Sequence, residues 1–284
     1  MISRRDLLQL SAAGLATLAL RKFSFAAEER IPLGVQLYTV RDQAEKNLNQ
    51  VLAQINKIGY QEVELYWNVY SHPAAELRRM VADNGLRAPS GHFNYDGLAA
   101  KLDYAKALGV QYVICPMLPK DMWNSADGFK KAADQFNRWG EQVHSMGMQF
   151  GFHNHNYEFQ KFGNLTGYDI LTQNTDAKLV CLEMDCYWIT QAGQDPITML
   201  KKFGSRIQLL HLKDRKPGFP TSQQLGPAAE HITEVGSGTI DWKTLLTLAQ
   251  QQGVKGYFVE RDSGSTPAME SIAISYQYLN KLLT

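Results

Sequence analysis

Cysteine is scarce in this chain, and the few cysteines do not form a recognisable motif. The 284 residues include only Cys115, Cys181 and Cys186, and no two of them have C-x-x-C spacing. That absence argues against zinc-ribbon and dithiol redox motifs. Cys181 and Cys186 are five residues apart, so on one strand they would point to opposite faces and could not bridge. We therefore expect three buried free thiols.

The chain also lacks an excess of charge and a long hydrophobic run. Lys and Arg total 29 and Asp and Glu total 28, so no global field attracts nucleic acid or an anionic membrane. Residues 7–20 carry no charge, but this run is shorter than the ~20 residues needed to span a bilayer. We predict neither a nucleic-acid partner nor a stable membrane span.

The N-terminus has the layout of an export signal. Arg4 and Arg5 precede the uncharged run, and small residues follow near Ala26. This arrangement resembles a twin-arginine signal, so we predict that residues 1–27 are a signal peptide and that the protein is periplasmic. The basic pair at 21–22 leaves an uncleaved signal open, and a buried N-terminal helix is the alternative interpretation.

Short apolar segments alternate with amphipathic ones along the remainder, 28–284, which we interpret as one domain. This alternation predicts a (β/α)8 barrel, a fold that commonly occupies ~250 residues. The predicted strands are 33–38, 62–66, 86–91, 112–117, 149–153, 179–185, 208–212 and 256–260. The predicted helices are 47–58, 74–84, 95–108, 128–146, 168–174, 196–203, 241–251 and 267–283.

An open, doubly wound sheet is the alternative fold. It usually carries a Gly-rich phosphate loop after its first strand, and the segment VQLYT at 35–39 has no glycine. The irregular stretch 214–239 is the longest connection and is rich in Pro, Gly and Gln. We predict that it forms a functional loop over the barrel mouth.

The predicted strand ends carry an unusual number of ionisable side chains. Active sites of (β/α)8 barrels form at the carboxyl ends of the strands, so these side chains should converge on one rim. They are Glu64, His92, His153, His155, Glu158, Glu183, Asp185, His211, Lys213, Asp214 and Glu260.

Carboxylates and imidazoles crowded on one rim indicate a bound cation. Without it they would repel or desolvate one another, and a divalent metal suits mixed nitrogen and oxygen ligands. Asp185, His211 and Glu260 end three consecutive strands, and a fourth ligand should come from the segment at 152–159. The cofactor is therefore predicted to be a divalent cation such as Mn, Mg, Zn or Co.

Several segments resemble the sugar phosphate isomerase/epimerase family of the xylose isomerase-like TIM barrel superfamily. The resemblance extends from GVQLY at 34–38 to the last helix. Its most specific segments are FHNHNYEF (152–159), EMDCYW (183–188), AGQDP (192–196), LHLKD (210–214), EVGSGTIDW (234–242) and FVERD (258–262).

The resemblance implies a metal held by Glu, Asp, His and Glu from strands five to eight. Asp185, His211 and Glu260 match the last three ligands. His153 occupies the position of the first Glu, so we predict that Glu158 takes its place, with the imidazole of His153 or His155 as the alternative ligand.

A second departure from the family is Trp188, where several epimerases have a His. An aromatic ring there suits stacking on a sugar. The residues predicted to act in catalysis are His153, His155, Lys213 and Glu64, and those predicted to bind substrate are His92, Trp188, Tyr38 and Arg261.

These residues predict an enzyme that removes a proton next to the carbonyl of a sugar. The metal would acidify the adjacent C–H bond, a neutral His would take the proton, and Lys213 would stabilise the enediolate. Reprotonation makes an isomerase or epimerase, our first prediction. Loss of a β-substituent makes a lyase acting on a 3-keto-sugar or keto-glycoside. A non-catalytic sugar-binding barrel is the third alternative. The partner is a small sugar, and a homo-oligomer is compatible with the sequence.

Overall fold

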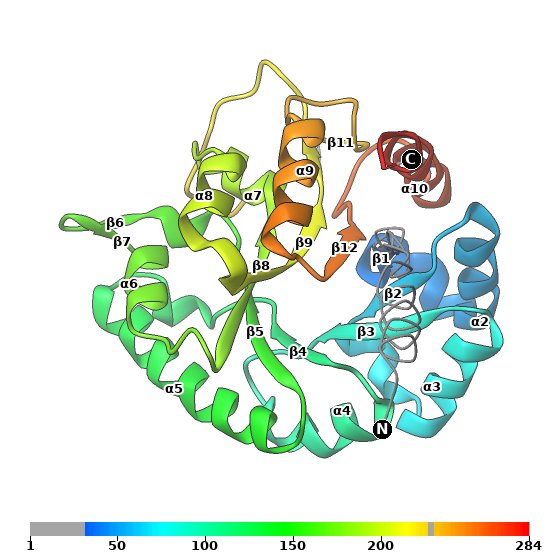
Figure 1. Ribbon diagram of the computed structural model, residues 1–284, viewed down its shortest axis with the longest axis horizontal. Helices are drawn as coiled ribbons and strands as arrows, with labels where there is room; N and C mark the ends of the chain where they lie inside the picture. The colour runs from blue at the N-terminus through cyan, green and yellow to red at the C-terminus, as the bar shows by residue number, and fades with distance from the viewer. Residues whose placement is uncertain (1–31, 227–229, 284) are drawn as a thin grey trace, which may run out of the picture. The chain divides into compact units, whose positions relative to one another are not determined.

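A computed structural model describes residues 32–226 and 230–283, so the predicted signal peptide lies outside the described residues. The described chain forms a closed barrel of parallel strands, in the order β1-β12-β9-β8-β5-β4-β3-β2 (Figure 1). This confirms the predicted fold. The barrel strands are β1 (Leu33–Gln36), β2 (Glu62–Leu65), β3 (Arg87–His92), β4 (Tyr112–Cys115), β5 (Gln149–His153), β8 (Val180–Asp185), β9 (Ile207–Leu212) and β12 (Gly256–Val259).

Helices connect these strands and lie outside the barrel (Figure 1). They are α2 (Arg41–Ile58), α3 (Ala74–Asp83), α4 (Leu102–Leu108), α5 (Ala126–Ser145), α6 (Gly167–Gln173), α7 (Cys186–Gln191), α8 (Pro196–Phe203), α9 (Trp242–Gln252) and α10 (Ala268–Leu282). Two short antiparallel pairs are β6 (Lys161–Phe162) with β7 (Leu165–Thr166), and β10 (Asp214–Arg215) with β11 (Ile232–Thr233).

Glycines with a positive φ decide where some of the helices begin or end. Gly109 ends α4 at a φ of 86°, a left-handed conformation that glycine adopts without steric cost. One predicted helix, 95–108, begins later than expected. Gly97 at a φ of 83° turns the chain, so the α-helix starts only at Leu102.

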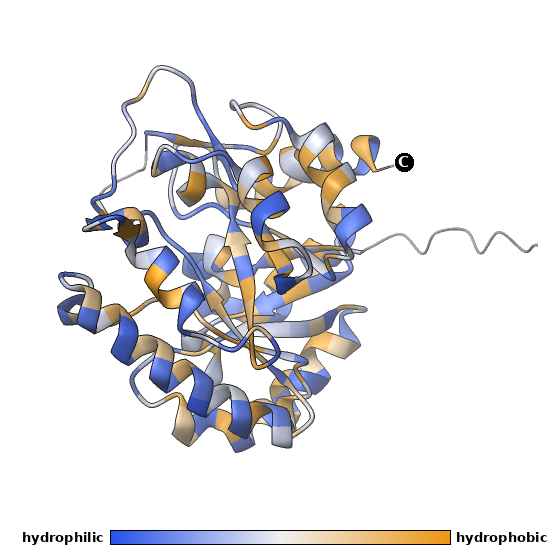
Figure 2. Ribbon diagram, turned by 60° about the vertical axis from the view of Figure 1, so that its left-hand side comes forward, coloured by the Kyte–Doolittle hydropathy of each residue, from blue (hydrophilic) through white to orange (hydrophobic). Residues whose placement is uncertain are grey.

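The barrel interior is closely packed below the site. Strands of parallel barrels are buried on both faces, and all residues of β1, β4 and β12 are buried. Figure 2 shows apolar residues concentrated on the strands, and helices with apolar and polar sides. A Cβ atom on Gly34 would lie 2.5 Å from the Phe258 ring, so glycine is required there. The three cysteines are buried and free, as predicted.

The connection after β9 is fixed by one carboxylate, Asp214. It accepts hydrogen bonds from the backbone amides of Gly236, Gly238 and Thr239 and from the indole of Trp242. A buried carboxylate with this many donors is satisfied without a cation. The loop predicted at 214–239 is therefore anchored at both ends beside the barrel mouth.

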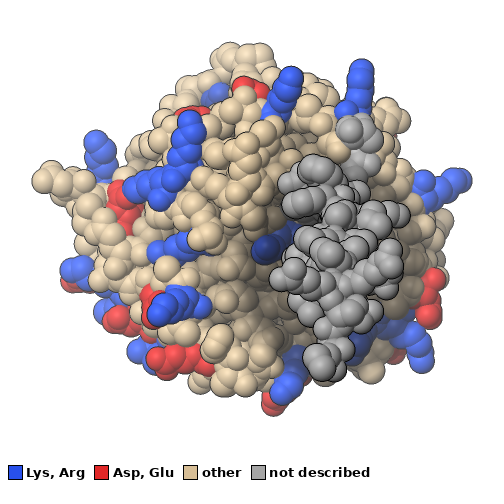
Figure 3. Space-filling view, in the orientation of Figure 1, with Lys and Arg blue, Asp and Glu red and all other residues tan. Residues whose placement is uncertain are grey.

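Charged side chains on the described surface are mixed. On the face in Figure 3, Lys and Arg are spread around the periphery, with Asp and Glu between several of them. Among the described residues, every helix is too short or too polar to cross a bilayer.

Candidate active site and metal centre

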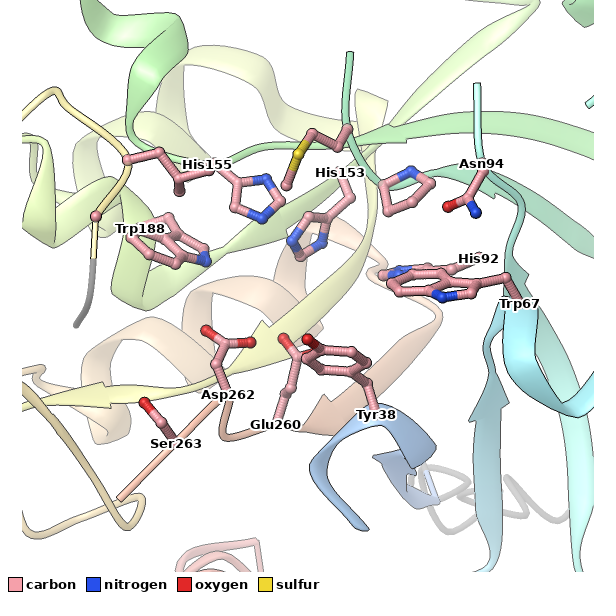
Figure 4. A pocket seen from close by; sticks show the side chains of 14 residues that line it. Tyr38, Trp67, His92, Asn94, His153, His155, Trp188, Glu260, Asp262 and Ser263 are labelled. Carbon is pink, nitrogen blue, oxygen red and sulfur yellow. The ribbon is translucent and has the colours of Figure 1, made fainter. Parts of the chain in front are cut away.

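The carboxyl ends of the strands surround a cavity of about 560 Å³. Figure 4 shows the imidazoles of His153 and His155 on one side of it and Tyr38, Glu260 and Asp262 on the opposite side. The lining residues are Tyr38, Trp67, His92, Asn94, Pro116, Met117, His153, His155, Trp188, Leu225, Gly226, Glu260, Asp262 and Ser263. Of the predicted site residues, His92, His153, His155, Trp188, Tyr38 and Glu260 thus share one cavity.

Four side chains from neighbouring strands of the barrel converge at this cavity: His153 and Glu260 line it, and Asp185 and His211 are buried next to them. His153, Asp185, His211 and Glu260 each offer a ligand atom, and these atoms all lie within 4.8 Å of one another. We call this set the donor group. His153 ends β5, Asp185 ends β8, His211 lies on β9, and Glu260 directly follows β12. Strand order, rather than proximity in sequence, brings them together.

Each imidazole of the donor group is backed by a carboxylate from the layer below. His211 directs Nδ1 to Glu260 Oε2 at 2.9 Å, and its Nε2 lies 2.6 Å from Glu64 Oε2. His153 directs Nε2 toward Asp185 at 3.8 Å, and its Nδ1 lies 3.1 Å from Glu183 Oε2. A carboxylate behind the imidazole fixes the ring and its tautomer, as is usual for metal-binding histidines.

Lys213 supplies positive charge beside the donor group. Its ammonium lies 3.0 Å from Asp185, 2.7 Å from Glu260 and 2.9 Å from Asp262. Burial alone would lower the pKa of an amine. These carboxylates outweigh burial and raise the pKa of Lys213. Lys213 is completely buried and does not line the cavity, so its predicted contact with substrate is not seen here.

Burial and charge set the protonation of the acidic groups. Burial raises the pKa of Asp185 to about 6 and that of Glu183 to about 7. Burial also acts on Glu260, but Lys213 and His211 outweigh it and lower its pKa. The carboxylates of Glu64 and Glu183 raise the pKa of His92 to about 9 against the effect of burial. The group is thus held together by charges of both signs.

The donor group fits a divalent cation. Asp185 Oδ2 is buried and faces a nitrogen of each imidazole of the group, His153 Nε2 at 3.8 Å and His211 Nδ1 at 3.9 Å, with the Lys213 ammonium beside it at 3.0 Å. Two imidazole nitrogens and two carboxylates are a ligand set for Zn or Mn, and both rings have the required second-layer carboxylate. A second set of close donors is His92, His153, Glu183 and His211. In that set Glu183 Oε2 lies 2.7 Å from His92 Nε2, and the set has one carboxylate where the donor group has two.

Glu64 was predicted to be catalytic; this role stays a prediction, and the contacts of Glu64 indicate a supporting role. It is fully buried below the donor group, where Gln36 and Ser90 also donate to it, and it does not line the cavity. Through its 2.6 Å contact with Nε2, Glu64 fixes the orientation of the His211 ring. The cause lies in the barrel register, since Glu64 pairs with Ser90 one layer below the strand ends.

Replacing Glu64 with Gln is expected to weaken metal affinity about 10- to 100-fold, the usual cost of losing a second-layer partner. Calorimetric titration of metal into chelator-treated protein measures this. The matched control is Glu62→Gln, on the same strand but at its other end, where the carboxylate pairs with Arg87 at 3.1 Å. Unchanged metal affinity in Glu64→Gln would show that the carboxylate does not support a ligand.

Glu158 was predicted to be the fourth ligand, and that assignment stays a prediction; the side chain that lies close to Asp185, His211 and Glu260 is His153. The chain turns in a 3-10 helix at Tyr157–Phe159, and both carboxylate oxygens of Glu158 accept from the backbone amide of His155, at 3.1 and 3.0 Å. Glu158 is not one of the donors gathered with Asp185. The alternative left open by the sequence, an imidazole ligand, agrees with the geometry.

His155 is a histidine of the cavity that does not belong to the donor group. It lines the cavity, its ring centre lies 5.1 Å from that of His153, and it is flanked by Tyr157 and Trp188. Its buried Nδ1 has no hydrogen-bond partner among the described residues. Burial lowers the pKa of His155 to about 3, so the ring is neutral near pH 7.

Arg261 was predicted to bind substrate and points elsewhere. Its guanidinium pairs with Glu234 at 3.0 Å and donates to the Thr266 carbonyl, and it does not line the cavity. Consecutive residues of an extended chain face opposite sides. With Glu260 directed to the donor group, Arg261 must point away.

The sequence interpretation did not include several residues that line the cavity, among them Asn94, Trp67 and Asp262. Asn94 lies just beyond β3, and Asp262 has the same parity as Glu260, which was a usable signal. Trp67 comes from a 3-10 helix after β2 and stacks at a tilt on Tyr38, with ring centres 5.5 Å apart. No strand pattern indicates such a contact.

Fold and site together define a (β/α)8 barrel with a set of side chains at its mouth that could hold a cation. The model of the xylose isomerase-like TIM barrel family matches residues 52–282, and the chain belongs to that family. The chain is thus a xylose isomerase-like protein, as the sequence resemblance indicated.

Individual relatives are similar over most of their length. The chain is 27% identical to inosose dehydratase of Clostridium botulinum (strain Alaska E43 / Type E3), covering 84% of this chain and 90% of that protein. A sugar phosphate isomerase/epimerase from Parabacteroides distasonis ATCC 8503 has a TM-score of 0.74 and 24% identity, covering 91% of this chain and 97% of that one. The IOLI protein, solved with a zinc atom, has a TM-score of 0.68 and 18% identity, covering 89% and 98%.

Proposed function

We propose that this protein is a divalent-metal-dependent lyase that acts on a keto-sugar or keto-cyclitol derivative. The observation that supports it most is that His155, a neutral imidazole whose Nδ1 has no hydrogen-bond partner among the described residues, lies in the same cavity as His153 and Glu260 of the donor group. The relatedness to inosose dehydratases supports an eliminating reaction on a polyhydroxylated ketone. The metal would be held by His153, Asp185, His211 and Glu260.

When bound, the cation would polarise the substrate carbonyl and acidify the neighbouring C–H bond. The side chains divide the remaining work. His155, on one side of the cavity, accepts the proton from that carbon. Tyr38 and Asp262, on the other side (Figure 4), are placed to donate a proton to a departing oxygen. Trp188 and Trp67 give the cavity flat apolar walls for a ring.

These groups account for each bond broken or formed and each proton moved in an elimination. The C–H bond next to the carbonyl breaks toward His155, a C=C bond forms, and the β-carbon–oxygen bond breaks while its oxygen takes up a proton. Isomerisation or epimerisation, the first prediction from the sequence, starts with the same step and is the second candidate. It is favoured by the presence of Asp262 on the opposite side, which could return the proton to the other face of the carbon.

Incubation of metal-loaded protein with keto-cyclitols and 3-keto-glycosides in D2O, followed by NMR, tests the proposal. A lyase yields an unsaturated ketone and releases water or an alcohol. An isomerase yields a saturated stereoisomer or positional isomer with deuterium at the abstracted carbon. Turnover without deuterium exchange and without a primary isotope effect at that carbon would exclude proton abstraction. A sugar-binding barrel would give binding but no new product.

We also propose export by the twin-arginine route, supported by Arg4 and Arg5 before the uncharged run. Arg4→Lys with Arg5→Lys is expected to leave the protein folded but in the cytoplasm. Cell fractionation with immunoblotting measures this. Continued export of the double variant would contradict the assignment. A matched control, Arg21→Lys, changes a nearby arginine outside the pair and is expected to leave export intact.

A further inference from the structure

A second cavity, of about 550 Å³, adjoins the first and has a different lining. Leu225 lines both cavities, so the two are neighbours on either side of this residue. The second cavity is lined by Lys120, Trp123, Asn124, Gln160, Ser222, Gln223, Gln224 and Leu225. Apart from one lysine, its polar groups are neutral amides and a hydroxyl. We call it the outer cavity.

The aromatic wall of the outer cavity is rigid. One face of Trp123 stacks on Tyr157, with ring centres 3.9 Å apart and planes 14° apart. The indole nitrogen donates to the Leu118 carbonyl at 2.9 Å, and the Tyr157 hydroxyl accepts from the Leu118 amide at 3.0 Å. Because one face is packed, the other side of the indole is what the cavity contacts. A fixed aromatic face is a platform for the apolar C–H face of a pyranose.

A second wall of the outer cavity is formed by residues 222–224, whose main chain is also held by hydrogen bonds. Asn156, which is buried, donates to the backbone carbonyls of Ser222 at 2.8 Å and Gln224 at 3.0 Å. The Ser222 amide donates to the carbonyl of Gln191 at 2.7 Å. The main chain is thereby held from below, while the side chains of Gln223 and Gln224 are exposed. Side-chain amides both donate and accept, which matches the hydroxyl groups of a sugar.

We propose that the outer cavity is a subsite for a second pyranose ring, linked glycosidically to the ring in the first cavity. The substrate class is then a keto-disaccharide rather than a monosaccharide. The lining argues against an anionic group, because Lys120 is its one cation among eight residues. The identity of the inner ring as a keto-sugar rests on the proposed function, whereas the binding of a second ring does not.

Isothermal titration of metal-loaded protein with unreactive sugars tests the subsite without catalysis. Cellobiose, lactose and trehalose are compared with methyl glucoside. We expect at least one disaccharide to bind about tenfold more tightly than methyl glucoside. Trp123→Ala should remove that gain and leave methyl glucoside affinity unchanged. The matched control is Trp67→Ala, which removes an aromatic wall of the first cavity and should weaken both kinds of ligand.

A second variant covers the case that Trp123→Ala fails to fold, since it loses its stacking on Tyr157. Gln223→Ala with Gln224→Ala changes exposed side chains only and should weaken the disaccharide about three- to tenfold. Equal affinity for all disaccharides and methyl glucoside, or no effect of the variants, would overturn the subsite. Turnover of keto-monosaccharides in that case would leave the proposed function standing. Trp123-dependent disaccharide binding without any turnover would refute the function and support the subsite.

Discussion

Asp185→Asn is expected to abolish metal binding and turnover together, with kcat falling about 10³-fold or more. Asp185 is a buried anionic member of the donor group, and its Oδ2 faces both imidazoles of that group. Asn keeps the size of the side chain and the oxygen that caps α7, where Asp185 Oδ1 accepts from the Trp188 amide at 2.8 Å. Fold should therefore survive while the anionic ligand is lost. Metal analysis by mass spectrometry and steady-state kinetics measure the two effects.

The control for Asp185→Asn is the same substitution at another helix cap. Asp195 caps α8 by accepting hydrogen bonds from the amides of Ile197 and Thr198, and it is not a member of the donor group. Asp195→Asn should retain full metal content and activity. If Asp185→Asn kept a stoichiometric metal and wild-type turnover, the donor group would not be the metal centre.

His155→Gln is expected to lower kcat by about 10²-fold or more while the metal stays bound, because a general base typically contributes that much. His155 lines the cavity but does not belong to the donor group. Its backbone amide, which Glu158 holds at 3.0 Å, is unchanged by the substitution. Solvent deuterium exchange into recovered substrate should fall in parallel, because the variant loses the group that removes the proton.

Two further histidine variants make this test specific. His153→Gln should lose the metal, because His153 is a member of the donor group. His144→Gln, on the exposed side of α5, should change neither metal content nor kcat. Loss of metal from His155→Gln would make that imidazole a ligand, and full activity would exclude it as the base.

The barrel was predictable because each of its units carries local signals. Strand β5 spans Gln149–His153, as the apolar pattern predicted, and α8 spans the predicted 196–203. Glycine after the last helical residue marked the helix ends, as at Gly59 and Gly253, both with positive φ. Asp185, His211 and Glu260 were found because active-site residues of barrels gather at strand ends.

The rest of the site depended on features that strand periodicity does not encode. Glu158 follows β5 by five residues, and only the 3-10 turn at Tyr157–Phe159 decides that its carboxylate returns to the His155 amide. Glu64 is at a strand end in sequence, but the barrel register buries it below the rim. Arg261 follows Glu260 in an extended segment, so alternation of side chains directs it away from the cavity.

Anomalous diffraction from crystals soaked in Mn²⁺ tests the central claim most directly. The expected result is one peak in the donor group, within roughly 2.0–2.3 Å of a nitrogen of His153, a nitrogen of His211 and carboxylate oxygens of Asp185 and Glu260. A peak coordinated by Glu158, or one between His92 and Glu183, would contradict the account.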